Sequence, residues 1–324
     1  MANLSKKKKF MNQLSIGQII VELVKLSRPI HWIKNMSMFA ALLFSGGLLV
    51  PEMYTRVILA FFSFSFITSA TYIFNDIFDA HLDRLHPIKR TRPIAAGKIS
   101  VPSALLMIMA YLITSFFIAS NLNTLFLLTL VAYLSIQAVY SLGFKNIPII
   151  DILIIAAGFI LRVYAGAFVI DSHLSVWFLL CVISIALFLA VGKRRAEQGI
   201  LPEGKTRVSL SKYKRELLNS YVTMFGNAAW MSWALFTFFE SPPPTLPVWL
   251  FLAEISRATT VSKLLMITIP VVIFGIMRYE ALIFENRSES PERLLLKDRA
   301  LVFSVFLWVF LVVAILYGGN LFIG

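Results

Sequence analysis

A run of acidic side chains in the first third of the chain has the spacing of a metal site. Asp76, Asp79 and Asp83 follow Asn75 in the sequence NDIFDAHLD. On a helix that turns ~100° per residue, the three carboxylates fall within about 60° of one another on one face. Like charges along one stripe repel, and a hard cation such as Mg²⁺ removes that repulsion while keeping positions open for phosphate. The spacing therefore predicts a Mg²⁺ site near a helix end.

Basic side chains follow these acids directly. His86, Lys89, Arg90 and Arg92 all lie in the segment HPIKRTR. Acids that hold a metal beside bases that hold phosphate describe a metal–diphosphate site. The competing interpretation is a solvated loop of mixed charge, but the run follows a very apolar segment. A zinc site that includes His81 is disfavoured, because the stripe carries carboxylates and no thiolate.

A second motif combines charge with an apolar helix over residues 140–166. Tyr140 and Lys145 precede Asp151, and Arg162 follows eleven residues later. Eleven residues turn a helix by ~1100°, so Asp151 and Arg162 share a face. An arginine within an apolar span is expensive unless it faces the interior and has a partner. Two interpretations stay open: Arg162 binds an anion in a cavity, or it forms a structural salt bridge to Asp151 or to an acid on the second span.

A third charged motif, GKRRAE, occupies residues 192–197. Its Lys193, Arg194 and Glu197 follow the sixth apolar segment, and its bases suit a phosphate group. The competing interpretation is an ordinary positively charged anchor on the cytoplasmic side of a membrane. A fourth charged stretch, 278–299, is predicted to border a cytoplasmic opening.

The composition is that of a membrane protein. Of 324 residues, 58% are apolar and only 15% are charged, whereas a soluble domain carries roughly 25% charged residues. The net charge is +13. Because the bases flank apolar segments, the expected partners are the membrane and phosphorylated substrates, and nucleic acid is excluded as a partner. The single cysteine rules out an intramolecular disulfide.

Nine apolar segments are long enough to approach the ~30 Å of a bilayer core. The chain is therefore predicted to be an all-α polytopic membrane protein with nine transmembrane helices. We place these segments near 36–52, 57–78, 102–120, 123–141, 149–170, 174–192, 217–240, 258–278 and 301–322.

The distribution of bases predicts the orientation. With the N-terminus in the cytoplasm, 26 of the 30 lysines and arginines fall on the cytoplasmic side. The C-terminus is then outside the cell membrane, and the site faces the cytoplasm. Residues 1–35 form a cytoplasmic or interfacial segment before the transmembrane domain, 36–324. The cytoplasmic loops expected to carry catalysis are 75–98, 140–151, 192–216 and 278–299.

The chain resembles the UbiA superfamily of intramembrane prenyltransferases at NDIFDAHLD. It is most similar to one branch, the decaprenyl-phosphate phosphoribosyltransferases, and the likeness covers nearly the whole chain. The similar segments are RPIHWIKN at 28–35, HPIKRTRPIAAG at 86–97, YSLGFKNIPIID at 140–151, GFILRVYAGA at 158–167, GKRRAE at 192–197 and PERLLLKDR at 291–299.

This resemblance implies a nine-helix bundle with a central cavity open to the cytoplasm. It also implies Mg²⁺-dependent transfer of 5-phosphoribosyl from 5-phosphoribosyl-1-diphosphate to a polyprenyl phosphate, as in cell-wall precursor synthesis. The aspartates would hold the metal, with Asn75 orienting them. The implied substrate-binding residues are Lys34, Lys89, Arg92, Tyr140, Lys145, Asp151, Arg162, Lys193, Arg194 and Glu197. Among these, Lys193 and Arg194 would hold the 5-phosphate, and Lys145 or Arg162 the acceptor phosphate.

Three alternatives compete with this interpretation. Ordinary prenyltransferases of the superfamily carry a second aspartate motif after the sixth span, where this chain has GKRRAEQ. That difference argues against transfer of a prenyl group to an aromatic or other small acceptor. A transporter is disfavoured because the polar residues gather on one side, and a scaffold with a degenerate site is disfavoured by the intact acidic stripe. The sequence is compatible with a monomer or an oligomer.

Overall fold

The computed structural model describes residues 15–85, 89–200, 212–240, Pro242, 261–285, Leu294 and 297–321. Throughout these ranges the secondary structure is helical, and 3₁₀ helices are labelled η. The elements are α2 (Ile16–Ser27), η1 (Pro29–Met38), α3 (Phe39–Phe44), η2 (Gly47–Leu49), α4 (Pro51–Leu85), η3 (Lys89–Thr91), α5 (Val101–Ser120), α6 (Thr124–Ser141), η4 (Phe144–Asn146), α7 (Ile150–Val169), α8 (Val176–Ile200), α10 (Arg215–Phe239), η5 (Val261–Thr268), α12 (Ile269–Phe284) and α14 (Arg299–Leu321).

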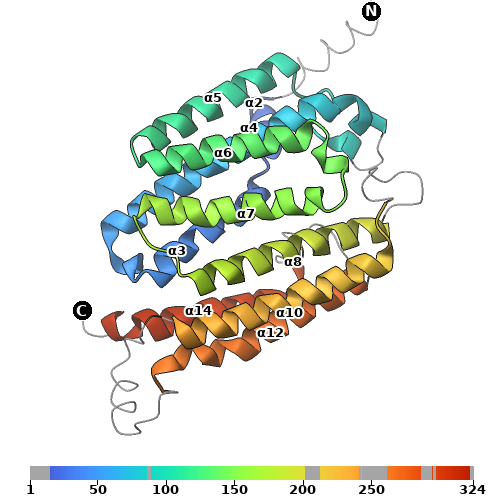
Figure 1. Cartoon of the computed structure of the whole chain (residues 1–324). Coiled ribbons are helices and arrows are strands. Elements are labelled where there is room, and N and C mark those ends of the chain that lie inside the picture. The colour runs from blue at the N-terminus through green and yellow to red at the C-terminus, as the bar shows by residue number, and fades with distance from the viewer. Residues whose placement is uncertain are drawn as a thin grey trace, which may run out of the picture.

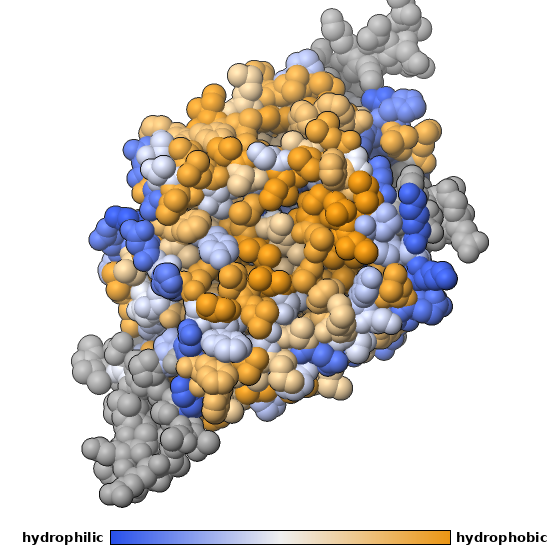
Figure 2. Space-filling model, viewed as in Figure 1, coloured by the Kyte–Doolittle hydropathy of each residue, from blue (hydrophilic) through white to orange (hydrophobic). Residues whose placement is uncertain are grey.

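The helices pack as a bundle with an apolar belt. In Figure 1, α5, α6, α7, α8 and α10 form a row in chain order, and consecutive members of the row contact each other. Helix α4 packs against α5, α6 and α7, while α12 contacts α10 and α14. Figure 2 shows an apolar band across the helices, with polar residues at their two ends. This arrangement confirms the all-α membrane architecture.

Seven helices in the described ranges are long and apolar enough to cross a membrane. They are α4, α5, α6, α7, α8, the joined η5–α12 segment and α14. Helix α10, expected as the seventh span, is 25 residues long but less apolar, because it carries Asn219, Thr223 and Asn227.

The first expected span, 36–52, is not one continuous helix. Its residues belong to η1, the six-residue α3 and the three-residue η2. Gly46 between α3 and η2 has a φ of 80°, a left-handed conformation that glycine adopts without the steric penalty of a side chain. A glycine pair therefore breaks this apolar segment where hydropathy alone predicts an uninterrupted helix.

The 3₁₀ geometry of η1 fits it to α4. A 3₁₀ helix has three residues per turn, so Trp32 and Asn35 lie on the same side. Trp32 Nε1 donates to Ser69 Oγ at 3.0 Å, and Asn35 Nδ2 donates to Ser65 Oγ at 2.9 Å. Ser65 and Ser69 are one α-helical turn apart on α4. These bonds fix the segment that precedes α3 against the helix that carries the aspartates.

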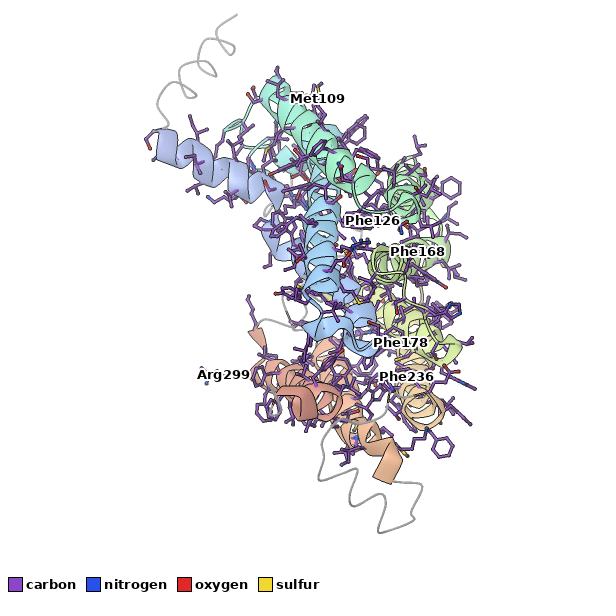
Figure 3. All side chains as sticks on the ribbon, turned by 90° about the vertical axis from the view of Figure 1, so that its left-hand side faces the viewer. Met109, Phe126, Phe168, Phe178, Phe236 and Arg299 are labelled. Atoms are coloured by element: carbon purple, nitrogen blue, oxygen red, sulfur yellow. The ribbon has the colours of Figure 1, made fainter. Side chains whose placement is uncertain are left out.

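Helix α7 approaches η1 very closely. A Cβ on Gly166 would lie 2.0 Å from the carbonyl oxygen of Met38, so only glycine permits this backbone contact. One apolar cluster joins Phe64 of α4, Leu130 and Tyr133 of α6 and Ala165 of α7, all fully or almost fully buried. Side chains from all the helices fill the space between them in the side view (Figure 3).

Candidate active site

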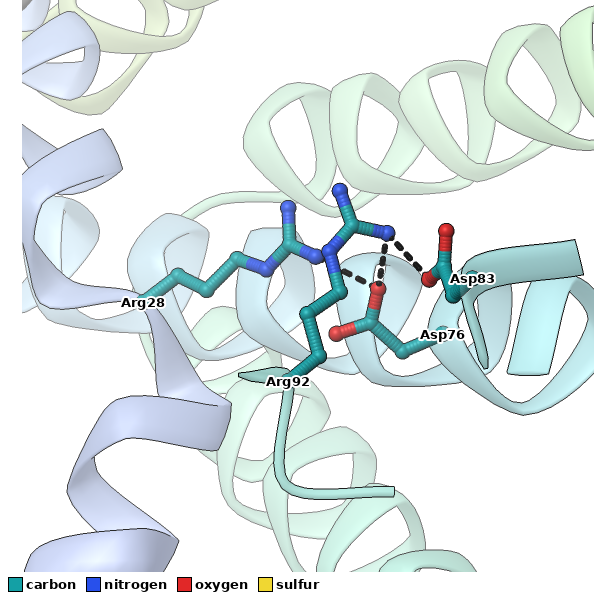
Figure 4. Close-up of polar contacts among 4 residues, drawn as sticks. All are labelled: Arg28, Asp76, Asp83 and Arg92. Atoms are coloured by element: carbon teal, nitrogen blue, oxygen red, sulfur yellow. Dashed lines mark hydrogen bonds and ion pairs between the residues drawn. The ribbon is translucent and has the colours of Figure 1, made fainter. Parts of the chain in front are cut away.

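The acidic motif lies on the last turns of α4, where the sequence places it. Helix α4 extends seven residues beyond the expected span end at 78, to Leu85. Arg92 Nη1 donates to Asp83 Oδ2 at 2.6 Å and to Asp76 Oδ1 at 3.1 Å. One guanidinium reaches both carboxylates because they share a face of the helix (Figure 4). Both aspartates are 3% exposed, so their charges lie inside the bundle.

A second arginine, Arg28, completes this cluster. Its Nη2 donates to Asp76 Oδ1 at 2.5 Å, and its guanidinium lies 5.2 Å from the ring centre of Tyr72. Arg28 is the C-terminal cap of α2, with a left-handed φ of 52°. Glycine usually occupies such a cap, and a side chain there costs roughly 1–2 kcal/mol. Sequence reasoning missed Arg28, whose only signal is its place at the start of RPIHWIKN.

The other two residues of the motif have different surroundings. Asp79 is half-buried and has no ion-pair partner in the described part of the chain. Asn75 Oδ1 accepts a hydrogen bond from Ser141 Oγ at 2.9 Å. Asp79 is therefore the most available carboxylate, and Asn75 joins α4 to the end of α6.

The donor set of this cluster fits a hard cation. Carboxylate oxygens are the ligands that Mg²⁺ prefers, and the buried Oδ2 of Asp76 has no hydrogen-bond partner. No three histidine, cysteine or acidic side chains in the described ranges are close enough to hold a metal as they stand. Arg28 and Arg92 instead neutralise Asp76 and Asp83. A bound cation would compete with these arginines for the same oxygens.

A second polar cluster surrounds Arg194, which is fully buried. Its Nε lies 2.6 Å from Asp151 Oδ2, and its Nη1 donates to Glu197 Oε2 at 2.6 Å. Its Nη2 donates to Tyr140 OH at 3.0 Å. Arg194 is thus engaged with the protein, and its predicted contact with a substrate phosphate stays a prediction. Its surroundings favour a role in shaping the wall of the site.

Tyr213 also belongs to this cluster and was not expected from the sequence. Its hydroxyl donates to Asp151 Oδ1 at 2.9 Å and accepts a hydrogen bond from the Ile149 N–H. Burial and the bond to Asp151 raise the pKa of this hydroxyl, so it stays protonated and acts as a donor. The only sequence signal is a tyrosine among the charged residues before α10.

Lys193 is the member of GKRRAE that is most available to substrate. It is half-buried and has no interaction partner in the described ranges. Arg195 is 2% exposed and its Nε donates to Asn219 Oδ1 at 2.6 Å. Lys145 on η4 is half-buried and, like Lys193, has no partner among the described residues. Lys193 and Lys145 are therefore cations without a counterion within the described ranges.

Lys34 and Lys89, two further predicted substrate-binding residues, are only partly accessible to solvent. Lys34 is half-buried on η1, and Lys89 is half-buried at the start of η3. Each has a partner within the protein. Lys89 begins η3, which contacts α4 and directly precedes Arg92.

Arg162 forms no salt bridge with the acids considered from the sequence. Its Nε donates to Asn35 Oδ1 at 2.7 Å, its Nη1 to Gly158 O at 2.5 Å and its Nη2 to Tyr133 OH at 3.1 Å. Within the described ranges its partners are all neutral, while Asp151 pairs with Arg194. The expected alternative of a structural salt bridge is therefore wrong, although the two residues lie on one helix. A 5%-exposed cation remains without a carboxylate.

The last turn of α6 connects the two charged clusters. Ser141 donates to Asn75 beside the aspartates, and its neighbour Tyr140 accepts a bond from Arg194. Asp76, Asp79 and Asp83 thus lie on one side of this turn, and the GKRRAE segment lies on the other. The arrangement can hold a metal and a diphosphate at one pole and a further phosphate at the other.

Comparisons with known proteins give relatives of one family. The sequence model of the UbiA prenyltransferase family matches residues 35–256. The chain is 34% identical to the decaprenyl-phosphate phosphoribosyltransferase of Corynebacterium glutamicum, over 91% of this chain and 86% of that protein. It is 32% identical to the protein of that name from Mycolicibacterium smegmatis, over 92% of this chain and 93% of that protein.

Solved structures show the same fold. A UbiA homolog from Archaeoglobus fulgidus bound to GPP and Mg²⁺ superimposes with a TM-score of 0.63 at 18% identity, covering 90% of this chain and 96% of that chain. The family match spans most of the chain, and two relatives above 30% identity extend along nearly its whole length. The chain therefore belongs to the UbiA prenyltransferase family.

Proposed function

We propose that the chain transfers 5-phosphoribosyl from 5-phosphoribosyl-1-diphosphate to a polyprenyl phosphate and releases diphosphate in a Mg²⁺-dependent reaction. The main support for this proposal is that the end of α6 connects two clusters of charged residues, which we call poles. One pole holds aspartates with two arginines, and the other presents Lys193 where ordinary prenyltransferases are expected to carry acids. A donor with phosphate groups at both ends fits such a pair, and the named relatives support the same reaction.

At the acidic pole, Asp76, Asp79 and Asp83 would hold Mg²⁺, and Asn75 would orient them. Bound Mg²⁺ supplies charge neutralisation for the leaving diphosphate. Arg28 and Arg92 already contact Asp76, and they would turn to the diphosphate oxygens once a cation neutralises the carboxylates. Lys89, on the same turn as Arg92, would add a further positive charge.

At the other pole, Lys193 would bind the 5-phosphate of the donor. Its neighbour Arg194 is fixed by bonds to Asp151, Tyr140 and Glu197, which would position this part of α8. As the bond from ribose C1 to the diphosphate breaks, positive charge develops on the ribose, and a lipid phosphate oxygen attacks C1. That oxygen is ionised at neutral pH, so no general base is required.

The acceptor phosphate needs a cation of its own. Lys145 has no partner in the described ranges, and the buried Arg162 contacts only neutral groups there. Either side chain supplies the positive charge that a lipid phosphate requires. Lys34 on η1 completes the proposed substrate-binding set.

We also propose that the chain crosses the cell membrane nine times, with the N-terminus in the cytoplasm. Helix α10 and the η1–α3–η2 segment would add two crossings to the seven apolar helices. The excess of bases on one side supports this orientation. The central cavity would then open to the cytoplasm, where the charged ends of α4, α6 and α8 gather.

Parallel incubations of the purified protein test the proposed reaction against its nearest alternative. One receives labelled 5-phosphoribosyl-1-diphosphate and a polyprenyl phosphate, and the other receives labelled prenyl diphosphate and 4-hydroxybenzoate. We expect a labelled lipid in the first reaction and no prenylated acceptor in the second. Product in the second incubation alone would establish an ordinary prenyltransferase instead.

Lys193→Ala is expected to raise the KM for the ribosyl donor by about tenfold or more, since a hydrogen bond to a charged group contributes roughly 1.5–3 kcal/mol. The KM for the lipid should change little, because Lys193 is proposed to bind the 5-phosphate of the donor and not the lipid. Steady-state kinetics with each substrate varied in turn gives both constants. Lys212→Ala, which removes an exposed lysine nearby, serves as the control. Equal increases in both constants would contradict a 5-phosphate role.

Arg28→Gly and Arg28→Ala form a matched pair that separates the side chain from its backbone conformation. Both are expected to lower kcat/KM for the donor by about 100-fold, because each removes a charged contact at the diphosphate pole. The glycine variant should be the more stable by about 1 kcal/mol, since only glycine relaxes at this φ. Kinetics and thermal unfolding of both variants provide the check. Wild-type activity in either one would remove Arg28 from the site.

A further inference from the structure

Glu22 is a buried carboxylate that the mechanism above does not use. It lies on α2 and is only 6% exposed. Its Oε1 accepts hydrogen bonds from Lys25 Nζ and Lys98 Nζ, each at 2.9 Å, while its buried Oε2 has no hydrogen-bond partner. Burying an ionised carboxylate is costly unless it is paired and hydrogen-bonded. Both lysine bonds fall on one of the two Glu22 oxygens, so the pairing is incomplete and the position of Glu22 points to a role beyond stability.

The Glu22 carboxylate is charged at neutral pH. Burial by itself raises its pKa, but the bonds and charges of Lys98 and Lys25 outweigh burial and hold the pKa below its ordinary value. The two lysines are not equivalent partners. Lys25 is on the same helix as Glu22, whereas Lys98 is 76 residues away in sequence. Only the Lys98 bond links two separate segments of the chain.

Lys98 belongs to a compact turn that also carries Arg92. The Lys98 N–H donates to Pro93 O at 2.9 Å, and the Ala96 N–H donates to Arg92 O at 2.8 Å. Ile94 is 3% exposed and anchors the turn in an apolar cluster. Because these bonds make the turn one unit, the position of Lys98 sets the position of Arg92.

Glu22 and Arg28 are also parts of one unit. Glu22 lies in the second half of α2, and Arg28 caps the C-terminus of the same helix, which extends away from α4 at the side of the bundle (Figure 3). Ser27, just before Arg28, accepts a bond from Ser69 Oγ at 2.8 Å through its carbonyl and pairs with Tyr111 OH at 2.6 Å. The end of α2 is thereby fixed, and the position of the helix determines where Arg28 enters the site.

We propose that Glu22 and Lys98 form a positioning clamp that holds the two diphosphate-binding arginines, Arg28 and Arg92, at a fixed separation. The ion pair joins the segment that carries one arginine to the segment that carries the other, and both arginines meet on Asp76 (Figure 4). Neither clamp residue is bonded to the aspartates. The clamp rests on the proposed function, and it pre-organises the pole that receives the donor's diphosphate.

The clamp is separable from folding. An apolar cluster already packs α2, α4, the Arg92 turn and α5 together through Leu26, Ile73, Ile94, Ile99 and Ala104. Loss of the ion pair is therefore expected to loosen the arginines without unfolding this part of the molecule. The effect should appear in donor binding, not in thermal stability.

Glu22→Gln and Lys98→Met test the clamp by kinetics. Each is expected to raise the KM for 5-phosphoribosyl-1-diphosphate by about tenfold, with little change in kcat or in the KM for the lipid. The double variant should be no worse than either single variant, because the two side chains act as one unit. Lys98→Arg, which keeps the ion pair, should restore the donor KM.

Lys25→Met is the matched control. It removes a bond of the same length to the same Glu22 oxygen, but that bond lies within one helix. The donor KM should therefore stay within about twofold of wild type, since the Lys25 bond does not join α2 to the turn that carries Arg92. A loss equal to that of Lys98→Met would show that only the charge balance of Glu22 matters, and it would overturn the clamp.

Metal binding without any substrate supplies a second readout. Mn²⁺, followed by its paramagnetic resonance signal, reports cation binding at the aspartates. Because loosened arginines compete less for Asp76, Glu22→Gln should bind Mn²⁺ at least as tightly as wild type while binding inorganic diphosphate more weakly in the presence of the metal. A parallel loss of both affinities would indicate general damage and contradict the clamp.

An inactive wild type would count against the proposed function, whereas an active wild type with an unchanged Glu22→Gln variant would count against the clamp alone.

Discussion

Asp79→Asn is expected to reduce turnover by about three orders of magnitude, because neutralising a metal ligand removes several kcal/mol of transition-state stabilisation. Of the three aspartates, Asp79 is the one whose replacement is easiest to interpret. It has no ion-pair partner in the described part of the chain, so its loss leaves no buried cation unpaired. Kinetics at saturating Mg²⁺, together with a thermal unfolding curve, give the activity and the stability of the variant.

The comparison with Asp76→Asn sharpens this test. That change should also abolish turnover, but it leaves Arg28 and Arg92 facing a neutral amide and should lower stability as well. Asp171→Asn, which removes an exposed carboxylate at a left-handed position, is the control and should retain full activity. Near-wild-type turnover by Asp79→Asn would remove Asp79 from the metal site.

Asp151→Asn is expected to destabilise the protein by about 3 kcal/mol, the lower end of the cost of breaking a buried ion pair, because Arg194 keeps Glu197 as a second partner. Asp151 and Arg194 are both fully buried and 2.6 Å apart. The asparagine also weakens the bond from Tyr213. The free energy of unfolding in detergent measures the effect.

A solvent-exposed ion pair provides the reference against which this loss of stability is compared. Glu52 and Arg56 are 2.7 Å apart, with side chains 73% and 44% exposed. Glu52→Gln should therefore cost less than about 1 kcal/mol. Replacing both Asp151 and Arg194 by apolar residues of similar size should recover much of the lost stability. An Asp151→Asn variant as stable as Glu52→Gln would show that the buried pair does not hold this wall together.

Local periodicity was enough to predict that Asp76 and Asp83 share one face of α4. This depends only on residues within two turns of one helix, so helix geometry determines it. The end of the helix was not predicted, because α4 continues from the expected span end at 78 to Leu85. The same reasoning placed Asp151 and Arg162 on one face of α7. It could not assign their partners, which come from Arg194 on α8 and Asn35 on η1.

The features that the sequence did not predict escaped prediction for one shared physical reason. Arg28 reaches Asp76 across 48 residues of sequence, and it does so because a non-glycine residue adopts a left-handed cap. Hydropathy also cannot distinguish a 3₁₀ helix from an α-helix, so the break of the first expected span into η1, α3 and η2 was not anticipated. Contacts that depend on an unusual backbone conformation or on distant helices require the folded structure.

The most direct test of the account is a chelation experiment on the purified protein. It receives 5-phosphoribosyl-1-diphosphate labelled in the ribose, a polyprenyl phosphate and Mg²⁺, with and without a chelator, beside Asp79→Asn in Mg²⁺. The proposed reaction gives a labelled lipid and an equal amount of diphosphate with the wild-type protein, and neither product with the chelator or in the variant. A labelled lipid that forms equally well without Mg²⁺, or no labelled lipid at all, would contradict it.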